Sequence, residues 1–124
     1  MSIAYDVREQ PPAAFIEIMV MNLGAKVKQP ARAKLDTGAS VTVIPESLAT
    51  TLDLKARGEI LAQGFDGVGS WRKLYWVSIE VAEFSVPTEV IASSRDHVLL
   101  GRDVLNHFII TLDGKAQTFE MIDP

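Results

Sequence analysis

"KLDTGASVTVIP" (residues 34–45) places a short acidic turn, Asp36-Thr37-Gly38, between two apolar stretches. A carboxylate in a tight turn after a strand, with a glycine two residues later, can be held against the backbone amides of its own loop. Such a group is either a surface turn residue or one half of a catalytic pair that acts on water. The rest of the chain has to distinguish these two interpretations.

The composition indicates one compact domain over residues 1–124, of which 48% are hydrophobic. A formal net charge of -4 and the lack of any Lys/Arg run argue against a nucleic-acid partner. No stretch approaches the about 18 apolar residues of a membrane span, and the first residues lack the pattern of a secretory signal. The absence of cysteine excludes disulfides, thiol catalysis and zinc–thiolate sites. We therefore expect a cytoplasmic protein without a membrane span.

The first half of the chain reads as strands with one short helix. Residues 13–21 and 27–35 are rich in extended-favouring residues, and Pro30 predicts an edge or a bulge because proline cannot donate to a ladder. Ile44, Leu48 and Leu52 recur at intervals of four, so residues 45–52 predict a helix with proline in its first turn.

The second half predicts a long hairpin over residues 59–81, whose return arm alternates with a period of two and has one apolar face. Further segments are a strand or pair of strands at 83–93, a buried run at 97–101, a helix face at 102–108 and a terminal hairpin around Asp113-Gly114. The apolar face of the return arm consists of Tyr75, Val77, Ile79 and Val81. The predicted fold class is mostly β with one or two short helices.

Three features in order now carry a family resemblance: "LDTGAS" at 35–40, a later glycine-rich hairpin, and "VLLGR" at 98–102 before a short helix. Together, over residues 13–122, they resemble a retropepsin-like aspartic protease subunit. The resemblance implies a closed β-barrel of the acid protease fold, one lobe per chain, with a flap hairpin. It also implies an aspartic endopeptidase that needs neither metal nor cofactor.

The chemistry of that family needs two carboxylates that share one proton. This chain has a single Asp-Thr-Gly, because Asp66-Gly67 and Asp113-Gly114 lack the intervening hydroxyl residue. The resemblance therefore makes Asp36 the catalytic residue and assigns the second carboxylate to an identical chain across a twofold axis. A homodimer acting on an extended peptide or protein substrate follows.

The neighbours of Asp36 take their roles from the same resemblance. The Thr37 hydroxyl reaches the opposite loop of the dimer, or it is an ordinary turn hydroxyl that bonds locally. Gly38 presents backbone to the substrate where a Cβ would intrude. Ala39 stands where the pepsin-like enzymes tend to carry Ser or Thr, so we expect a less acidic working pH than pepsin's.

The tip of the long hairpin resembles the flap that closes over a bound peptide, and its alternative is an ordinary exposed hairpin. Its candidate substrate-binding residues are Gly64, Phe65, Asp66, Gly67, Val68 and Gly69. Trp71 and Phe65 either wall substrate pockets or pack on the strand beneath, and we expect packing.

A second group has a structural role beneath the active-site loop by resemblance: Leu99, Leu100, Gly101 and Arg102. In viral relatives the arginine pairs with an acidic residue four positions after the catalytic aspartate, but this chain has Ser40 there. Asp103 follows Arg102 where those relatives often carry Asn. The usual ion pair is therefore not expected.

His97 and His107 are expected at the surface or at a helix end, because their spacing matches no metal site. The strand "TFEMI" (118–122) is the candidate for joining the halves of the dimer. Two alternatives stay open: a noncatalytic interaction module, and a latent protease that becomes active only when it is concentrated.

Overall fold

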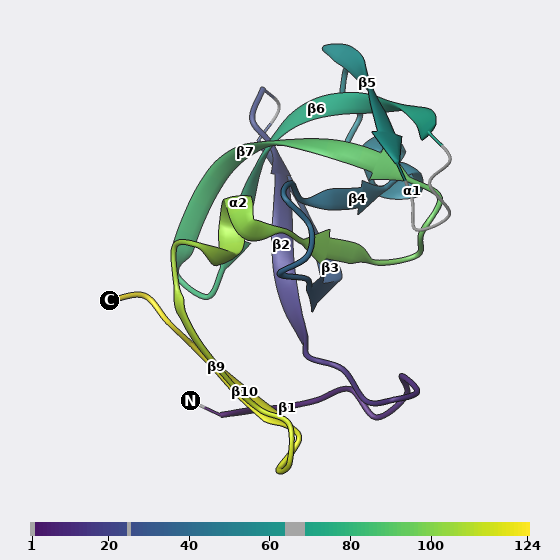
Figure 1. The fold of residues 1–124 in the computed structure, drawn as a ribbon. Helices are drawn as coiled ribbons and strands as arrows, with labels where there is room; N and C mark the ends of the chain where they lie inside the picture. The colour runs from purple at the N-terminus through teal and green to yellow at the C-terminus, as the bar shows by residue number, and fades with distance from the viewer. Residues whose placement is uncertain (1, 25, 64–68) are drawn as a thin grey trace.

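The computed structural model describes residues 2–24, 26–63 and 69–124, and a closed six-stranded β-barrel forms its main body (Figure 1). Around the barrel the strands are β2 (Phe15–Asn22), β3 (Val27–Leu35), β8 (Val98–Leu100), β4 (Val43–Pro45), β7 (Phe84–Ser93) and β6 (Gly69–Val81). β2 also pairs with β6, which closes the circle, and β5 (Gly58–Gln63) extends β6 outside it. The predicted mostly β, closed-barrel fold is confirmed.

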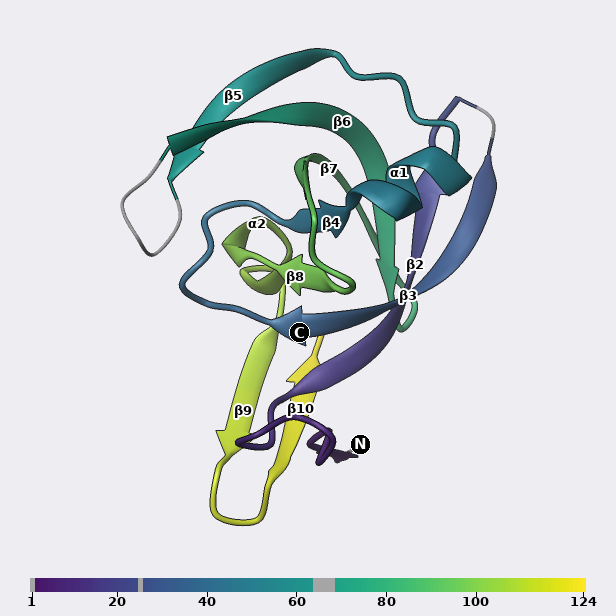
Figure 2. The same cartoon turned by 90° about the vertical axis from the view of Figure 1, so that its right-hand side faces the viewer.

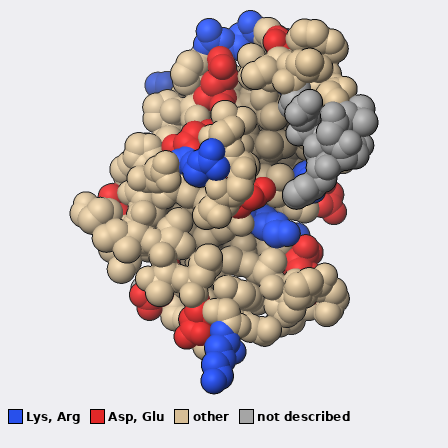
Figure 3. Space-filling view, in the orientation of Figure 1, with Lys and Arg blue, Asp and Glu red and all other residues tan. Residues whose placement is uncertain are grey.

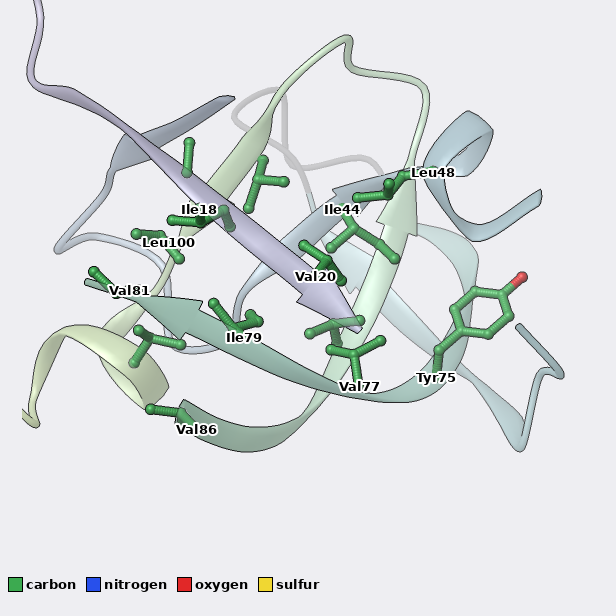
Figure 4. Packing of buried hydrophobic residues seen from close by; sticks show 14 of the residues in the cluster. Ile18, Val20, Ile44, Leu48, Tyr75, Val77, Ile79, Val81, Val86 and Leu100 are labelled. Carbon is green, nitrogen blue, oxygen red and sulfur yellow. The ribbon is translucent and has the colours of Figure 1, made fainter. Parts of the chain in front are cut away.

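Alternating side chains of the barrel strands fill its interior (Figure 4). The predicted apolar face of β6 is confirmed, because Tyr75, Val77, Ile79 and Val81 are all buried. Ile18 and Val20 of β2 point into the same core. Burying each such side chain stabilises the fold by about 1.5–3 kcal/mol.

Two short helices cover parts of the barrel. α1 (Glu46–Thr51) begins one residue later than predicted, because Pro45 still pairs with Ser93 of β7. α2 (Arg102–Leu105) directly follows β8 and buries Val104 and Leu105. Within the described parts of the chain, neither helix approaches the length and hydrophobicity needed to cross a membrane.

Pro30 lies at a free edge, as its missing N–H predicts. Among the described residues it pairs with Met19 of β2 alone, because β8 pairs with β3 from Ala33 to Leu35 and reaches no further. The sequence therefore placed this proline in a position that costs no ladder hydrogen bond.

A second, three-stranded sheet lies below the barrel (Figures 1 and 2). Its order is β1 (Ile3–Ala4), β10 (Thr118–Ile122) and β9 (Ile109–Asp113), all antiparallel. The predicted terminal hairpin is confirmed, but residues 114–117 connect its arms, with Gln117 at φ 58. β10 is the central strand, whereas the outer edge of β9 pairs with no strand of the described chain.

A cluster of Asp6, Arg8 and Arg32 connects the N-terminal segment to β3 of the barrel. The side chain of Asp6 is 10% exposed and accepts hydrogen bonds from Arg8 Nη2 at 2.7 Å and Arg32 Nε at 3.0 Å. These two guanidinium groups, Arg8 first, hold the pKa of Asp6 well below its usual range. The Arg32 guanidinium also lies 3.8 Å from the centre of the Phe15 ring on β2.

Candidate active site

Asp36 is the first residue after β3 and begins the loop that leads to β4, which we call the Asp36 loop (residues 36–42). β3 runs parallel to β8, with Leu35 opposite Leu100. The Asp36 N–H continues this ladder by donating to the Leu100 carbonyl at 3.0 Å. The backbone of Asp36 is therefore held by a hydrogen bond to the last residue of the buried strand β8.

The Asp36 carboxylate is held by its own turn, as the sequence predicted. Its Oδ1 accepts the Gly38 N–H at 3.0 Å, and the Ala39 N–H donates to the Asp36 carbonyl at 3.2 Å. A Cβ on Gly38 would lie 3.2 Å from the same Oδ1. Glycine therefore allows the backbone to approach the half-buried carboxylate closely.

The Thr37 side chain is exposed, and its hydroxyl has no hydrogen-bond partner among the residues that the structure describes. The alternative of a locally bonded turn hydroxyl is thus not observed. The Thr37 carbonyl, by contrast, accepts a hydrogen bond from Arg102 Nη1 at 2.8 Å. Ser40, at the position of the viral acid, is exposed, and within the described chain no carboxylate forms an ion pair with Arg102.

The segment Leu99 to Arg102 lies against the Asp36 loop. A Cβ on Gly101 would lie 2.6 Å from the Val41 carbonyl carbon and 2.7 Å from its oxygen. The Arg102 N–H donates to the Ala39 carbonyl at 2.9 Å. Leu99 and Leu100 are buried, with Leu99 opposite Val43 of β4.

Sequence reasoning assigned no role to the half-buried Asp103 carboxylate, which bonds to the end of this loop. Asp103 accepts hydrogen bonds from Thr42, Thr88 and Val104. The only sequence signals were the acidic residue beside Arg102 and a hydroxyl residue inside the apolar run at 41–44. Neither signal shows that residues so far apart in the chain meet.

The predicted flap tip cannot be compared with the structure, because Gly64, Phe65, Asp66, Gly67 and Val68 lie outside the described residues. Gly69 is described, and it opens β6 opposite Gln63. The predicted long hairpin is confirmed in its arms, which pair antiparallel from Gly58↔Leu74 to Gln63↔Gly69.

The expectation that Trp71 packs on the strand beneath is wrong. Its side chain is 67% exposed, and Leu61, its cross-strand partner, is 55% exposed. Trp71 borders a cavity of about 330 Å³ on the α1 side of the hairpin, lined also by Glu46 and Thr50. Asp36 does not line this cavity.

The two histidines differ in their surroundings. His97 Nδ1 donates a hydrogen bond to the Asp96 carboxylate at 2.7 Å, and the His97 ring lies edge-on to Phe15, while His107 is exposed after α2. The His97 contact lowers the pKa of Asp96. In the described part of the chain, no group of three or more His, Asp or Glu side chains could hold a metal ion.

Charge at the surface is mixed. Figure 3 shows basic and acidic residues interspersed over one face of the molecule, in keeping with the small net charge of -4. The described residues of this face form no continuous basic stripe of the kind that binds phosphate backbones.

The comparisons with known proteins agree with this geometry. A family model described as "gag-polyprotein putative aspartyl protease" matches residues 25–107. No curated protein sequence is significantly similar to the chain.

Solved retropepsin structures share the fold. A retropepsin-like aspartic protease from Rickettsia conorii is 17% identical with a TM-score of 0.69, covering 98% of this chain and 88% of its own. The EIAV protease bound to the inhibitor HBY-793 is 19% identical with a TM-score of 0.58, covering 84% and 92%. The simian foamy virus (mac) protease is 23% identical with a TM-score of 0.54, covering 73% and 92%.

Proposed function

Because the chain belongs to the gag-polyprotein aspartyl protease family, we propose that it is an aspartic endopeptidase that works as a homodimer. Asp36 and its copy in a second chain would activate the water that attacks the peptide bond. The observation that carries this proposal is the half-buried Asp36 carboxylate, held by the Gly38 amide in a loop bonded to β8.

The chemistry requires both copies. Two close carboxylates cannot both ionise cheaply, so one of them keeps a proton. The ionised carboxylate takes a proton from water while the water oxygen bonds to the peptide carbonyl carbon, and the protonated carboxyl gives its proton to the carbonyl oxygen. The C–N bond then breaks, the amine leaves with the proton taken from water, and the second carboxylate regains a proton from a hydroxyl of the hydrated carbonyl; aspartic proteases are the standard example. Within the described chain no second carboxylate is bonded to Asp36, so the isolated monomer is inactive in this proposal.

The free edge of β9 is the surface that we assign to the second copy. The sequence favoured β10, but β10 already has β1 and β9 on its two sides. Ile109 of β9 and Ile122 of β10 are cross-strand partners, 54% and 47% exposed. An unpaired apolar edge is a template for another strand, and a twofold axis would pair β9 with its copy.

Two further features fit a dimeric protease. The exposed Thr37 hydroxyl is free to bond to the loop of the partner subunit. The β5–β6 hairpin stands above the barrel (Figure 2), where its main-chain groups could add to an extended peptide. Ala39 offers no hydroxyl to the paired carboxylates, so we keep the expectation of a less acidic working pH than pepsin's.

The test is cleavage of a fluorescence-quenched peptide library at several protein concentrations, with sedimentation velocity on the same samples. Asp36→Asn should abolish cleavage and leave the dimer and the thermal transition unchanged, because the amide keeps the shape but cannot serve as the base. Asp53→Asn, at an exposed site where Asp53 pairs with Lys55, is the matched control and should cleave like the wild type.

Cleavage by Asp36→Asn at the wild-type rate would overturn the proposal. A stable dimer that cleaves nothing would instead favour the noncatalytic interaction module. Activity that appears only at high concentration, together with dimers, would identify the latent protease.

A further inference from the structure

We propose that Asp103 is a positioning residue for the Asp36 loop, whose carboxylate acts through Thr42 to hold the loop in its working geometry. This inference rests on the proposed function, because it takes Asp36 as the catalytic carboxylate. It assigns a role to a residue that touches neither Asp36 nor the space above it.

The Asp103 carboxylate is fully occupied by donors. Its Oδ1 accepts from the Thr42 hydroxyl at 2.8 Å and the Val104 N–H at 3.0 Å. Its Oδ2 accepts from the Thr42 N–H at 3.1 Å and the Thr88 hydroxyl at 2.9 Å. A carboxylate offers about four acceptor sites, and here each has a donor. The end of the Asp36 loop, β7 and the start of α2 therefore meet at one side chain.

Thr42 connects the Asp103 carboxylate to the Asp36 loop. It is the last residue of the Asp36 loop and is completely buried, at 0% exposure. Its hydroxyl donates to Asp103 and accepts the Gly101 N–H at 3.1 Å. Since Gly101 packs directly against Val41, the backbone just before Thr42 has no room to move toward β8.

The same segment of chain holds the loop at its other points. The Leu100 carbonyl accepts the Asp36 N–H, Arg102 Nη1 binds the Thr37 carbonyl, and the Arg102 N–H binds the Ala39 carbonyl. Residues 100–103 thus form hydrogen bonds to the beginning, the middle and the end of the Asp36 loop. The hydrogen bonds at the end of the loop, to Thr42, come from Asp103.

In this chain the four donors around residue 103 fit a carboxylate better than the amide that viral relatives often carry there. Each oxygen of Asp103 receives one main-chain N–H, from Thr42 on one side and Val104 on the other. An asparagine would turn its NH₂ group toward one of these donors in either orientation of the amide. In one orientation the Thr42 N–H loses its acceptor, and in the other the Thr42 hydroxyl does, whereas the Val104 N–H also donates to the Gly101 carbonyl at 3.1 Å. Either loss falls on Thr42, which is completely buried, and is therefore costly.

Loss of the Asp103 contacts should lower the rate of peptide cleavage more than it disturbs the barrel. The two Asp36 carboxylates must approach within hydrogen-bond range, about 3 Å. A displacement of roughly 1 Å in a catalytic group can cost about a hundredfold in rate. A loop held less firmly at Thr42 would therefore slow the chemical step while the barrel stays closed.

The experiment compares Asp103→Asn with Val20→Ala, a core variant in β2 whose strand partners are Gln29 and Ile79. For both, kcat and KM on a quenched peptide are measured at equal concentrations of folded dimer, together with amide hydrogen exchange. We expect Asp103→Asn to lower kcat at least about tenfold with KM within about twofold, whereas Val20→Ala keeps kcat. Equal kcat values in the two variants would overturn the proposal.

Amide exchange separates this proposal from the proposed function. A wild-type protein that cleaves nothing refutes the protease assignment, and exchange then decides the role of Asp103. Faster exchange at Asp36 and Ala39 in Asp103→Asn, but not in Val20→Ala, supports the positioning role of Asp103. Unchanged exchange at those amides refutes it.

A second pair of variants serves if Asp103→Asn does not fold. Thr42→Val removes the hydroxyl and keeps the volume, whereas Thr42→Ser keeps the hydroxyl. We expect Thr42→Val to lose kcat and Thr42→Ser to recover most of it. The same rate in both variants would show that the hydroxyl does not position the loop.

Discussion

Arg102 Nη1 lies 2.8 Å from the carbonyl oxygen of Thr37, so a cation on α2 fixes the residue next to Asp36. The family resemblance implied an ion pair for this arginine, and the acid it needs is replaced by Ser40. The main chain of the Asp36 loop takes the place of that acid. The arginine therefore still acts on the loop, through a different acceptor.

Arg102→Ala should loosen the loop at Thr37. We expect a loss of about 1 kcal/mol in unfolding free energy, because one charge-assisted hydrogen bond at an exposed site is removed. We also expect a several-fold lower kcat. Urea unfolding and peptide cleavage measure the two effects. Arg95→Ala, at an exposed position before β8, is the control, and an identical result for both variants would argue against the Thr37 contact.

Gly101→Ala should destabilise the fold because its new Cβ would lie 2.6 Å from the Val41 carbonyl carbon. Overpacking of this kind costs about 1–3 kcal/mol. Gly114→Ala is the matched control, since nothing lies within 4 Å of a Cβ there. Denaturant unfolding of the two variants should differ clearly. Equal stabilities would mean that the Asp36 loop moves aside at little cost.

Ile109→Lys should weaken the dimer. A charge at a side chain that is 54% exposed in the monomer would be buried when β9 meets its copy. We expect the dissociation constant to rise at least about tenfold, which corresponds to about 1.4 kcal/mol. Sedimentation equilibrium gives the constant, and Ile60→Lys, on β5 and 46% exposed, is the control. A dimer of wild-type strength would place the contact elsewhere.

Asp6→Asn should change how stability depends on pH. The folded pKa of Asp6 is depressed by Arg8 and Arg32, so its contribution is present above the unfolded value of about 3.9 and is lost as pH falls below it. The variant should be less stable than wild type at pH 7 and lose less stability on acidification. Urea unfolding of both proteins, at pH 7 and below the unfolded pKa of about 3.9, measures this difference in stability.

Asp53→Asn is the control for this pH effect. Asp53 pairs with Lys55 at the surface, where the side chains are 85% and 84% exposed. Such exposed pairs contribute little. The idea about Asp6 fails if its variant and the Asp53 variant follow the same pH curve.

Periodicity predicted much of the fold because it reports which side of an element is buried. The alternation in β6 identified Tyr75 to Val81 as a core face, and the spacing of Ile44, Leu48 and Leu52 identified α1. The turn at Asp36 was predicted for a local reason, since Gly38 lies two residues from the carboxylate that it binds. Each of these signals lies within a few residues of its consequence.

Nonlocal contacts were beyond the sequence. Thr42, Thr88 and Asp103 meet only because the loop end, β7 and α2 converge, and no spacing in the chain records that. The position of β10 between two strands also depends on β1, a strand of only two residues. Trp71 was expected to pack on the strand beneath, but the arm of β6 that carries it pairs with β5 outside the barrel, where Trp71 is 67% exposed.

The position of β8 also has a consequence in time. This strand comes late in the chain, yet it lies between β3 and β4, which come early, and its last carbonyl receives the Asp36 N–H (Figure 2). A growing polypeptide therefore cannot assemble the loop until residues 98–103 have left the ribosome. Contacts that span so much sequence form slowly. We expect an incomplete chain to carry the Asp-Thr-Gly turn without any ability to cleave the proteins around it.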